Sequence, residues 1–102
     1  MIPYDAEEYD RLYNALVLPF EEGSFEIDYD RYGEFLEYHL NNDRFVELGG
    51  LIINPEAGEV FYLDDEEYRR TTAFALDVVD GEVPAFVGVG GLRRETLLER
   101  GR

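Results

Sequence analysis

The sequence predicts an α/β fold in which helices cover a parallel sheet. Three short apolar segments alternate along the chain with segments whose apolar residues recur every three or four positions. Short apolar runs indicate buried strands, and the spacing of three and four indicates amphipathic helices. The order is β-α-β-α-β-α, and strands that alternate with helices pair in parallel through right-handed connections.

The predicted strands cover residues 12–20, 48–54 and 83–90. Each is apolar on both faces, as expected of a strand that is enclosed on both sides. The first is followed by a turn around Gly23. The sequence shows neither a linker nor an internal repeat beyond this alternation, so we expect one domain over residues 1–102.

The first helix is predicted from about Tyr29 to Asp43, with Asp28 as its N-cap. Its apolar stripe is predicted as Tyr29, Tyr32, Phe35, Leu36 and Leu40. His39 is the single histidine, and we expect it at the edge of this stripe, without a catalytic or metal-binding companion.

The second helix has the clearest start signal. Asp64 followed by Glu67 has the spacing of a capping box. Its inner stripe is predicted as Tyr68, Thr72, Ala75, Leu76 and Val79, and its i,i+4 ion pairs as Asp65 with Arg69 and Glu66 with Arg70. Asp80-Gly81 ends it, and a third helix is predicted over residues 93–100.

The composition excludes several classes of partner. The 102 residues hold 24 acidic and nine basic residues, a net charge of −15, and all nine basic residues are Arg. Nucleic acids and anionic membranes need a basic face, so neither is an expected partner. The chain has no Cys and its start lacks the features of a signal peptide, so we expect a cytoplasmic protein without thiolate metal sites.

Three local motifs have alternative interpretations. Residues 28–39 begin like a calcium-binding loop, but Tyr32 and His39 occupy ligand positions, so we predict no metal site. Glu56 and Glu59 are spaced as an acid/base pair, although two loop carboxylates three residues apart are common. The glycines at 88–91 predict either a phosphate cradle or a tight turn between strand and helix, and they lack the remainder of a P-loop.

Three longer segments, in the same order, resemble the dihydrodipicolinate synthase and N-acetylneuraminate lyase family. "ALVLPFEEGSFEIDYD" is similar to the family's first strand, which reads Ala-Leu-Val-Thr-Pro-Phe before a glycine turn and Ile-Asp-Tyr. "INPEAGEVFYLDDEEYRR" is similar to the second-strand signature Gly-Thr-Thr-Gly-Glu and the acidic helix start behind it. "DGEVPAFVGVGG" is similar to the third strand.

The resemblance implies the first three units of a (β/α)8 barrel, the TIM-barrel fold. Members are lyases and aldolases that join pyruvate, or a related 2-oxo acid, to a Lys on the sixth strand as a Schiff base. A Tyr on the fourth strand assists proton transfer, and no cofactor is implied. A complete barrel needs about 250 residues, so we expect both residues to lie beyond residue 102 and the chain to be the amino-terminal part of such an enzyme.

The loop after the second strand is the candidate substrate site by this resemblance. Gly58 and Glu59 match the end of the signature, whereas Pro55, Glu56 and Ala57 replace Gly-Thr-Thr. The hydroxyl groups that bind a substrate carboxylate are therefore missing. We expect the chain of 102 residues to be catalytically incomplete alone. We also expect it to associate with further copies or with a complementary barrel chain.

The alternative hypothesis is a non-catalytic α/β module that binds a partner chain. The reading frame beyond residue 102 separates the two hypotheses, because only a truncated enzyme would continue into the fourth and sixth strands.

Overall fold

The computed structural model describes residues 7, 9–55, 60–90 and 93–102. Their elements are, in chain order, β1 (Leu12–Ala15), α1 (Tyr29–Leu40), α2 (Asp43–Leu48), β2 (Gly49–Ile53), the 3-10 helix η2 (Val60–Tyr62), α3 (Asp65–Val79), β3 (Ala85–Val87) and α4 (Arg94–Arg100). The three strands pair in parallel in the order β1-β2-β3. The predicted α/β class, with its sheet of consecutive parallel strands, is confirmed.

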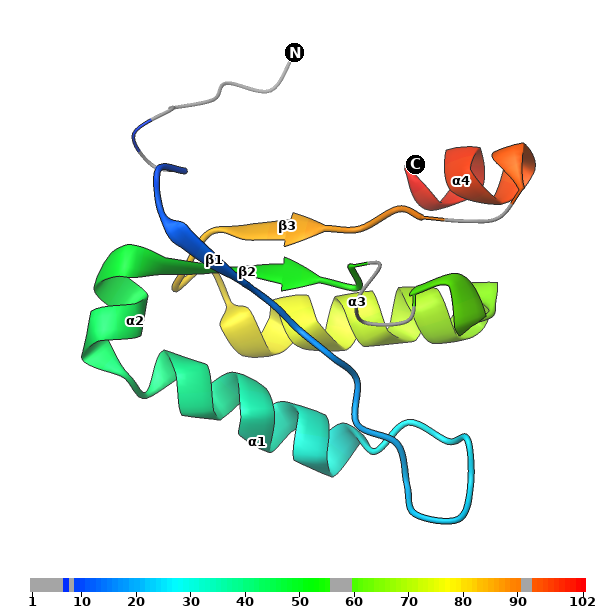
Figure 1. The fold of residues 1–102 in the computed structure, drawn as a ribbon, viewed down its shortest axis with the longest axis horizontal. Helices are drawn as coiled ribbons and strands as arrows, with labels where there is room; N and C mark the ends of the chain where they lie inside the picture. The colour runs from blue at the N-terminus through cyan, green and yellow to red at the C-terminus, as the bar shows by residue number, and fades with distance from the viewer. Residues whose placement is uncertain (1–6, 8, 56–59, 91–92) are drawn as a thin grey trace.

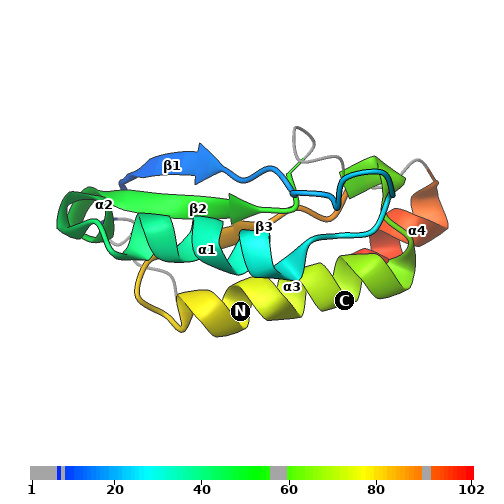
Figure 2. The same ribbon diagram turned by 90° about the horizontal axis from the view of Figure 1, so that it is seen from below.

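Helices α1 and α3 pack against one face of the sheet, as the two views in Figures 1 and 2 show. Side chains on a strand alternate between the two faces, and residues in register share a face. On the helix side, Leu51 and Ile53 of β2 are fully buried against Tyr32 and Leu36 of α1. This layer between sheet and helices forms the hydrophobic core.

None of the described helices covers the opposite face of the sheet (Figure 2), where the Tyr9 ring contacts Phe86 at 5.6 Å between centroids. We call this face the open face; it consists of the strand residues Tyr13, Ala15, Ile52 and Phe86, together with the exposed Val17, which follows β1. Val17 remains 55% exposed and Phe86 48% exposed. The strands are apolar on both faces, and the described helices cover one of these faces only.

Both predicted N-caps are confirmed. The Asp28 carboxylate accepts a hydrogen bond from the Arg31 amide at 3.0 Å. At α3, the Glu67 amide donates to Asp64 at 2.7 Å and the Asp64 amide donates to Glu67 at 3.0 Å, which completes the capping box.

The ion pairs of α3 differ from the prediction. Among the described residues, Asp65 pairs with Arg100 and Arg69 pairs with Glu99. Arg70 lies over the ring of Tyr29, 4.4 Å from its centroid. Contacts with α4 and α1 therefore replace the pairs that were expected within α3.

The first strand is shorter than predicted and the first helix is divided in two. β1 ends at Ala15, and the chain then turns back, so that Phe20 pairs with Ile27 in an antiparallel bridge. Pro19 has no amide hydrogen to donate to a sheet and favours such a turn. The helix expected to reach Asp43 ends at Leu40, because the side chain of Asn42 accepts from the Phe45 amide at 3.1 Å and begins α2.

The inner stripe of α1 is confirmed in part, and that of α3 is shifted. Tyr32, Leu36 and Leu40 are buried in α1, and Tyr29 and Phe35 pack against the core. In α3, Thr71 is buried in addition to Tyr68, Ala75 and Val79, whereas Leu76 is 44% exposed.

His39 is buried rather than at an edge, and it has specific partners. Its Nδ1–H donates to the Phe35 carbonyl at 2.8 Å, and its Nε2 accepts from the Asn14 amide group at 2.7 Å. The aromatic rings of Phe35, Tyr38 and Phe45 lie against it edge-on. These contacts explain His39 as a link between α1 and β1.

No helix among the described residues is both long and apolar enough to cross a membrane.

Candidate functional site

The candidate site lies at the carboxyl ends of the three strands. Ligands of parallel α/β folds bind at this end of the sheet, on the loops that follow the strands. Glu56, Ala57, Gly58 and Glu59, which sequence reasoning selected, lie outside the described residues, so their role stays a prediction. The structure describes the segment that ends at Pro55 and the segment that begins at Val60.

Asn54 fixes the point at which the chain leaves β2. Its backbone has a positive φ of 50°, a conformation that Asn tolerates better than most residues. The side chain is 1% exposed, and its amide group donates to Thr71 Oγ1 at 2.9 Å and to Thr72 Oγ1 at 2.8 Å. The start of the loop is therefore attached to α3.

The glycine at 88 is explained by close packing of two strand ends. A Cβ atom on Gly88 would lie 2.1 Å from the Asn54 carbonyl oxygen, so no larger residue fits without a shift. The Gly88 amide donates to the Ile53 carbonyl at 2.8 Å, and its own carbonyl accepts from the Tyr68 hydroxyl at 2.6 Å. Packing thus accounts for the first glycine of the motif without a phosphate.

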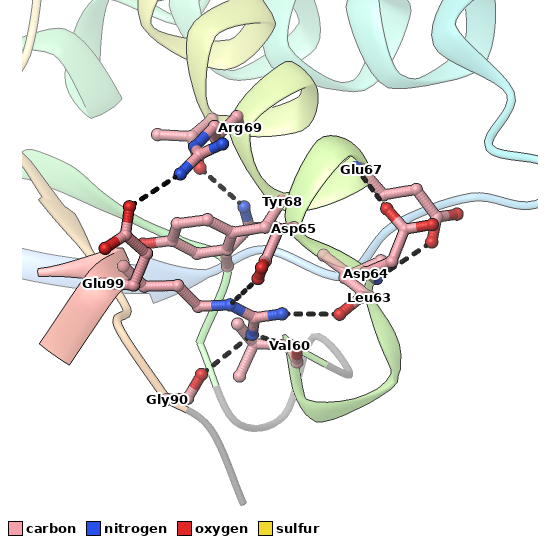
Figure 3. Close-up of polar contacts among 12 residues, drawn as sticks. Val60, Leu63, Asp64, Asp65, Glu67, Tyr68, Arg69, Gly90 and Glu99 are labelled. Atoms are coloured by element: carbon pink, nitrogen blue, oxygen red, sulfur yellow. Dashed lines mark hydrogen bonds and ion pairs between the residues drawn. The ribbon is translucent and has the colours of Figure 1, made fainter. Parts of the chain in front are cut away.

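Arg100 ties the loops after β2 and β3 together, and Figure 3 labels Val60, Leu63 and Gly90, whose carbonyls accept its hydrogen bonds. Its side chain is only 5% exposed. The guanidinium donates to three backbone carbonyls: Val60 at 3.0 Å, Gly90 at 2.9 Å and Leu63 at 2.5 Å. We call this set of contacts the Arg100 clamp.

Two side chains of α3, Asp65 and Tyr68, face the positive charge of the Arg100 guanidinium. Asp65 Oδ1 lies 3.5 Å from Arg100 Nε, and the guanidinium lies over the Tyr68 ring, 4.7 Å from its centroid. Burial raises the pKa of the Tyr68 hydroxyl, and the charge of Arg100 opposes that rise. Tyr68 therefore remains a neutral donor to Gly88 at physiological pH.

A large groove opens beside this cluster. We call it the aromatic groove; its volume is about 710 Å³, and the described residues that line it are Phe20, Ser24, Phe25, Tyr62, Leu63 and Glu67. A smaller hollow of about 220 Å³ also uses Glu67, and its other described lining residues are Glu26, Ile27, Tyr29, Asp64, Glu66 and Arg70. An apolar surface thus lies next to an acidic one.

The described residues offer binding surfaces rather than a catalytic constellation. Among them, no group of three or more His, Cys, Asp or Glu side chains is arranged to hold a metal ion. His39 is already bonded to Asn14 and Phe35, within the layer between sheet and helices. The contacts of Asn54, Gly88 and Arg100 position the loops that follow β2 and β3.

Comparison with known proteins gives the relationship. No family model matches the chain. It is 35% identical over 77 residues to 4-hydroxy-tetrahydrodipicolinate synthase of Kosmotoga olearia, which covers 76% of this chain and 24% of that protein. The corresponding enzyme of Thermotoga neapolitana is 32% identical over 85 residues, 83% of this chain and 27% of that protein.

A solved structure agrees with these relatives. Dihydrodipicolinate synthase from Aquifex aeolicus superimposes with a TM-score of 0.76 and 25% identity, over 90% of this chain and 29% of that one. This chain belongs to the dihydrodipicolinate synthase family. It spans about a quarter of the length of the curated relatives that it matches.

Membership of the dihydrodipicolinate synthase family confirms the resemblance and explains the open face. Three consecutive parallel strands with helices on one side form part of a (β/α)8 barrel, whose inner wall is the face without helices. Sequence reasoning missed Asn54 and Arg100. Asn directly after a buried strand is a signal for the first, whereas the role of Arg100 depends on contacts up to 40 residues away, and no local pattern marks it.

Proposed function

We propose that residues 1–102 form a single partial-barrel domain, which supplies the first three βα units of a dihydrodipicolinate synthase-like barrel. The parallel order β1-β2-β3 and the sequence relationship support this proposal. The activity of the completed barrel would be lyase or aldolase chemistry on pyruvate or a related 2-oxo acid. We further propose a cytoplasmic location.

The open face is the observation on which this proposal depends. In a closed barrel such side chains fill the interior, whereas here Val17 and Phe86 remain about half exposed. β1 and β3 are the two edges of the described sheet, and each has backbone groups available to another strand. The partner would therefore be a complementary barrel chain or a further copy.

These residues alone are proposed to be catalytically incomplete. The family chemistry requires a Lys amine that attacks the substrate carbonyl and loses water to form a Schiff base. The 102 residues contain no Lys. The 2-oxo acid would become a substrate only when the remaining strands are present.

Reductive trapping tests this proposal. We would incubate the chain with pyruvate and borohydride and measure its mass, and we expect no adduct on any side chain. The α-amino group of residue 1 is an amine that can react nonspecifically. A stoichiometric adduct mapped to any other residue, or aldol cleavage by the isolated chain, would contradict the proposal.

A second candidate function is a non-catalytic module that binds a partner chain. The replacement of Gly-Thr-Thr by Pro55, Glu56 and Ala57 favours it, because Glu56 would repel a substrate carboxylate. Calorimetry should then detect no binding of pyruvate, and the double variant Glu56→Thr/Ala57→Thr should restore weak binding at most. Millimolar or tighter binding by the unmodified chain would exclude this candidate.

A further inference from the structure

We infer that the aromatic groove binds an arginine-containing basic peptide segment of a partner protein. The inference rests on the exposure of the groove, on the charge beside it and on an arginine of this chain that already occupies the adjoining hollow. It is independent of the lyase chemistry proposed above.

Two aromatic side chains of the groove are almost fully exposed to solvent. Phe25 is 94% exposed and Tyr62 is 83% exposed. Large exposed aromatic residues at a groove are typical anchors of protein interfaces. Both therefore present apolar surface that a bound peptide would cover.

The loop with Phe25 is held by its own hydrogen bonds. The Glu21 amide donates to the Glu26 carbonyl at 2.8 Å, and the Glu26 amide donates to Ser24 Oγ at 3.2 Å. Gly23 provides the positive φ of 79° that the turn needs. In Figure 1 this loop extends beyond the amino-terminal end of α1. An ordered loop loses less conformational entropy when a partner binds.

The charge next to the groove selects a cationic partner. Glu67 lines both the groove and the hollow beside it, where Glu26 and Glu66 form no ion pair with any described residue. A 2-oxo acid or a nucleic acid would be repelled. A wholly apolar partner would remove the Glu67 carboxylate from water with the Asp64 amide as its hydrogen-bond donor but with no opposite charge, and a second copy would add another net charge of −15.

An arginine of this chain shows how such a cation would bind. Arg70 lies over the Tyr29 ring at 4.4 Å, in the hollow that also contains Glu66 and Glu67. A guanidinium above an aromatic ring and beside carboxylates gains from both. An arginine of the partner would have the same kind of surroundings between Phe25, Tyr62 and Glu67.

The test uses acetyl-Arg-Leu-Arg-Leu-Arg-amide as the probe, with binding measured by NMR titration and calorimetry. We expect shifts centred on the loop after β1 and on η2. Phe25→Ser and Tyr62→Ser should each weaken binding about 3- to 10-fold. Tyr38→Ser, at a 74% exposed aromatic position on α1, is the matched control and should stay within about twofold.

Charge is tested with a second pair of variants. The double variant Glu26→Gln/Glu66→Gln should weaken binding about 3- to 10-fold in low salt, and Glu34→Gln/Glu37→Gln on α1 should not. All positions are exposed or half-exposed, and circular dichroism verifies folding.

Three outcomes would overturn the inference. The first is equal binding of acetyl-Glu-Leu-Glu-Leu-Glu-amide. The second is an equal loss in the groove and control variants, which would show nonspecific attraction to an acidic surface. The third is binding of spermidine as tight as that of the peptide and insensitive to Phe25→Ser.

Discussion

Arg100 is a single side chain that joins segments distant in sequence. Its guanidinium holds the carbonyls of Val60, Leu63 and Gly90, and it is almost completely removed from water. A buried arginine is tolerated when most of its donors are satisfied and a carboxylate is close; here both terminal nitrogens donate to carbonyls, whereas Nε forms no hydrogen bond with the described residues and lies 3.5 Å from Asp65 Oδ1. The Arg100 clamp therefore fixes the two loops on either side of the candidate site.

Replacing Arg100 by Met should lower the free energy of unfolding by about 2–4 kcal/mol, because three carbonyls lose their donor and Asp65 loses its partner. Arg100→Lys should recover only part of the loss, since an ammonium lacks the planar fork. Urea unfolding followed by circular dichroism measures both. Arg102→Met is the control, because the Arg102 side chain is 79% exposed. An equal loss of unfolding free energy in Arg100→Met and Arg102→Met would refute the role of the clamp.

The buried hydroxyl of Tyr32 should make the free energy of unfolding depend on pH in the alkaline range. Its hydroxyl is buried and forms no hydrogen bond with the described residues, and burial raises its pKa above the ordinary value of 10. Above pH 10 the unfolded chain releases this proton while the folded chain keeps it, so the free energy of unfolding falls as pH rises.

Tyr32→Phe should therefore flatten the alkaline decline, and at pH 8 it should raise the free energy of unfolding by about 1 kcal/mol, because it removes an unsatisfied hydroxyl. Urea titrations at neutral and alkaline pH measure both effects. Burial also raises the pKa of Tyr29 and Tyr68, so part of the decline will remain. An unchanged pH profile would show that Tyr32 does not contribute.

At the scale of the elements, two glycines should respond to alanine with opposite signs. Gly88→Ala places a methyl group against the Asn54 carbonyl, where strands must separate, and should cost about 1–3 kcal/mol. Gly33 lies inside α1, and a Cβ there would meet the Phe74 ring at 3.4 Å, an ordinary contact. Gly33→Ala should therefore stabilise by about 0.5–1 kcal/mol. Thermal and urea unfolding of the two variants provide the comparison, and equal signs would contradict it.

The elements that the sequence predicted best are those with local signals. The capping box of Asp64 and Glu67 and the apolar runs of β2 and β3 depend on neighbouring residues; the capping box and β2 were confirmed, and β3 lies within the predicted range but is limited to Ala85–Val87. The short β1 and the break between α1 and α2 were not predicted. The turn around Gly23 was predicted and is confirmed, but the prediction of the strand and helix bounds followed apolar content alone and missed the early end of β1 and the cap at Asn42.

The candidate site was less predictable than the fold. Thr71 is buried and accepts a hydrogen bond from Asn54, at a strand end 17 residues earlier, and a helical stripe alone does not contain that information. The aromatic groove combines a loop with η2, which no pattern in the sequence indicated. The residues chosen by resemblance, 56–59, remain predictions.

For the whole molecule, the open face and the strand edges predict association that grows with salt. Edge pairing and apolar burial act at contact distance, whereas the repulsion from a net charge of −15 is screened beyond about 8–10 Å at ordinary ionic strength. Light scattering should show a larger mean mass in high salt than in low salt. Val17→Thr/Phe86→Thr on the open face should reduce the increase, and Tyr38→Thr on α1 should not.

A compact monomer that unfolds cooperatively in both low and high salt would contradict this expectation. The stand-alone module would then be favoured over the partial barrel, because the chain would have protected its own edges.

The burial of His39 makes the chain its own spectroscopic probe. As the single histidine, it gives one imidazole Hε1 resonance, and the edge-on rings of Phe35 and Phe45 displace that resonance from its position in an unfolded chain. Undocking of α1 from β1 would move the signal back, so the attachment of the first helix can be followed at one atom, without a label, while any partner is added.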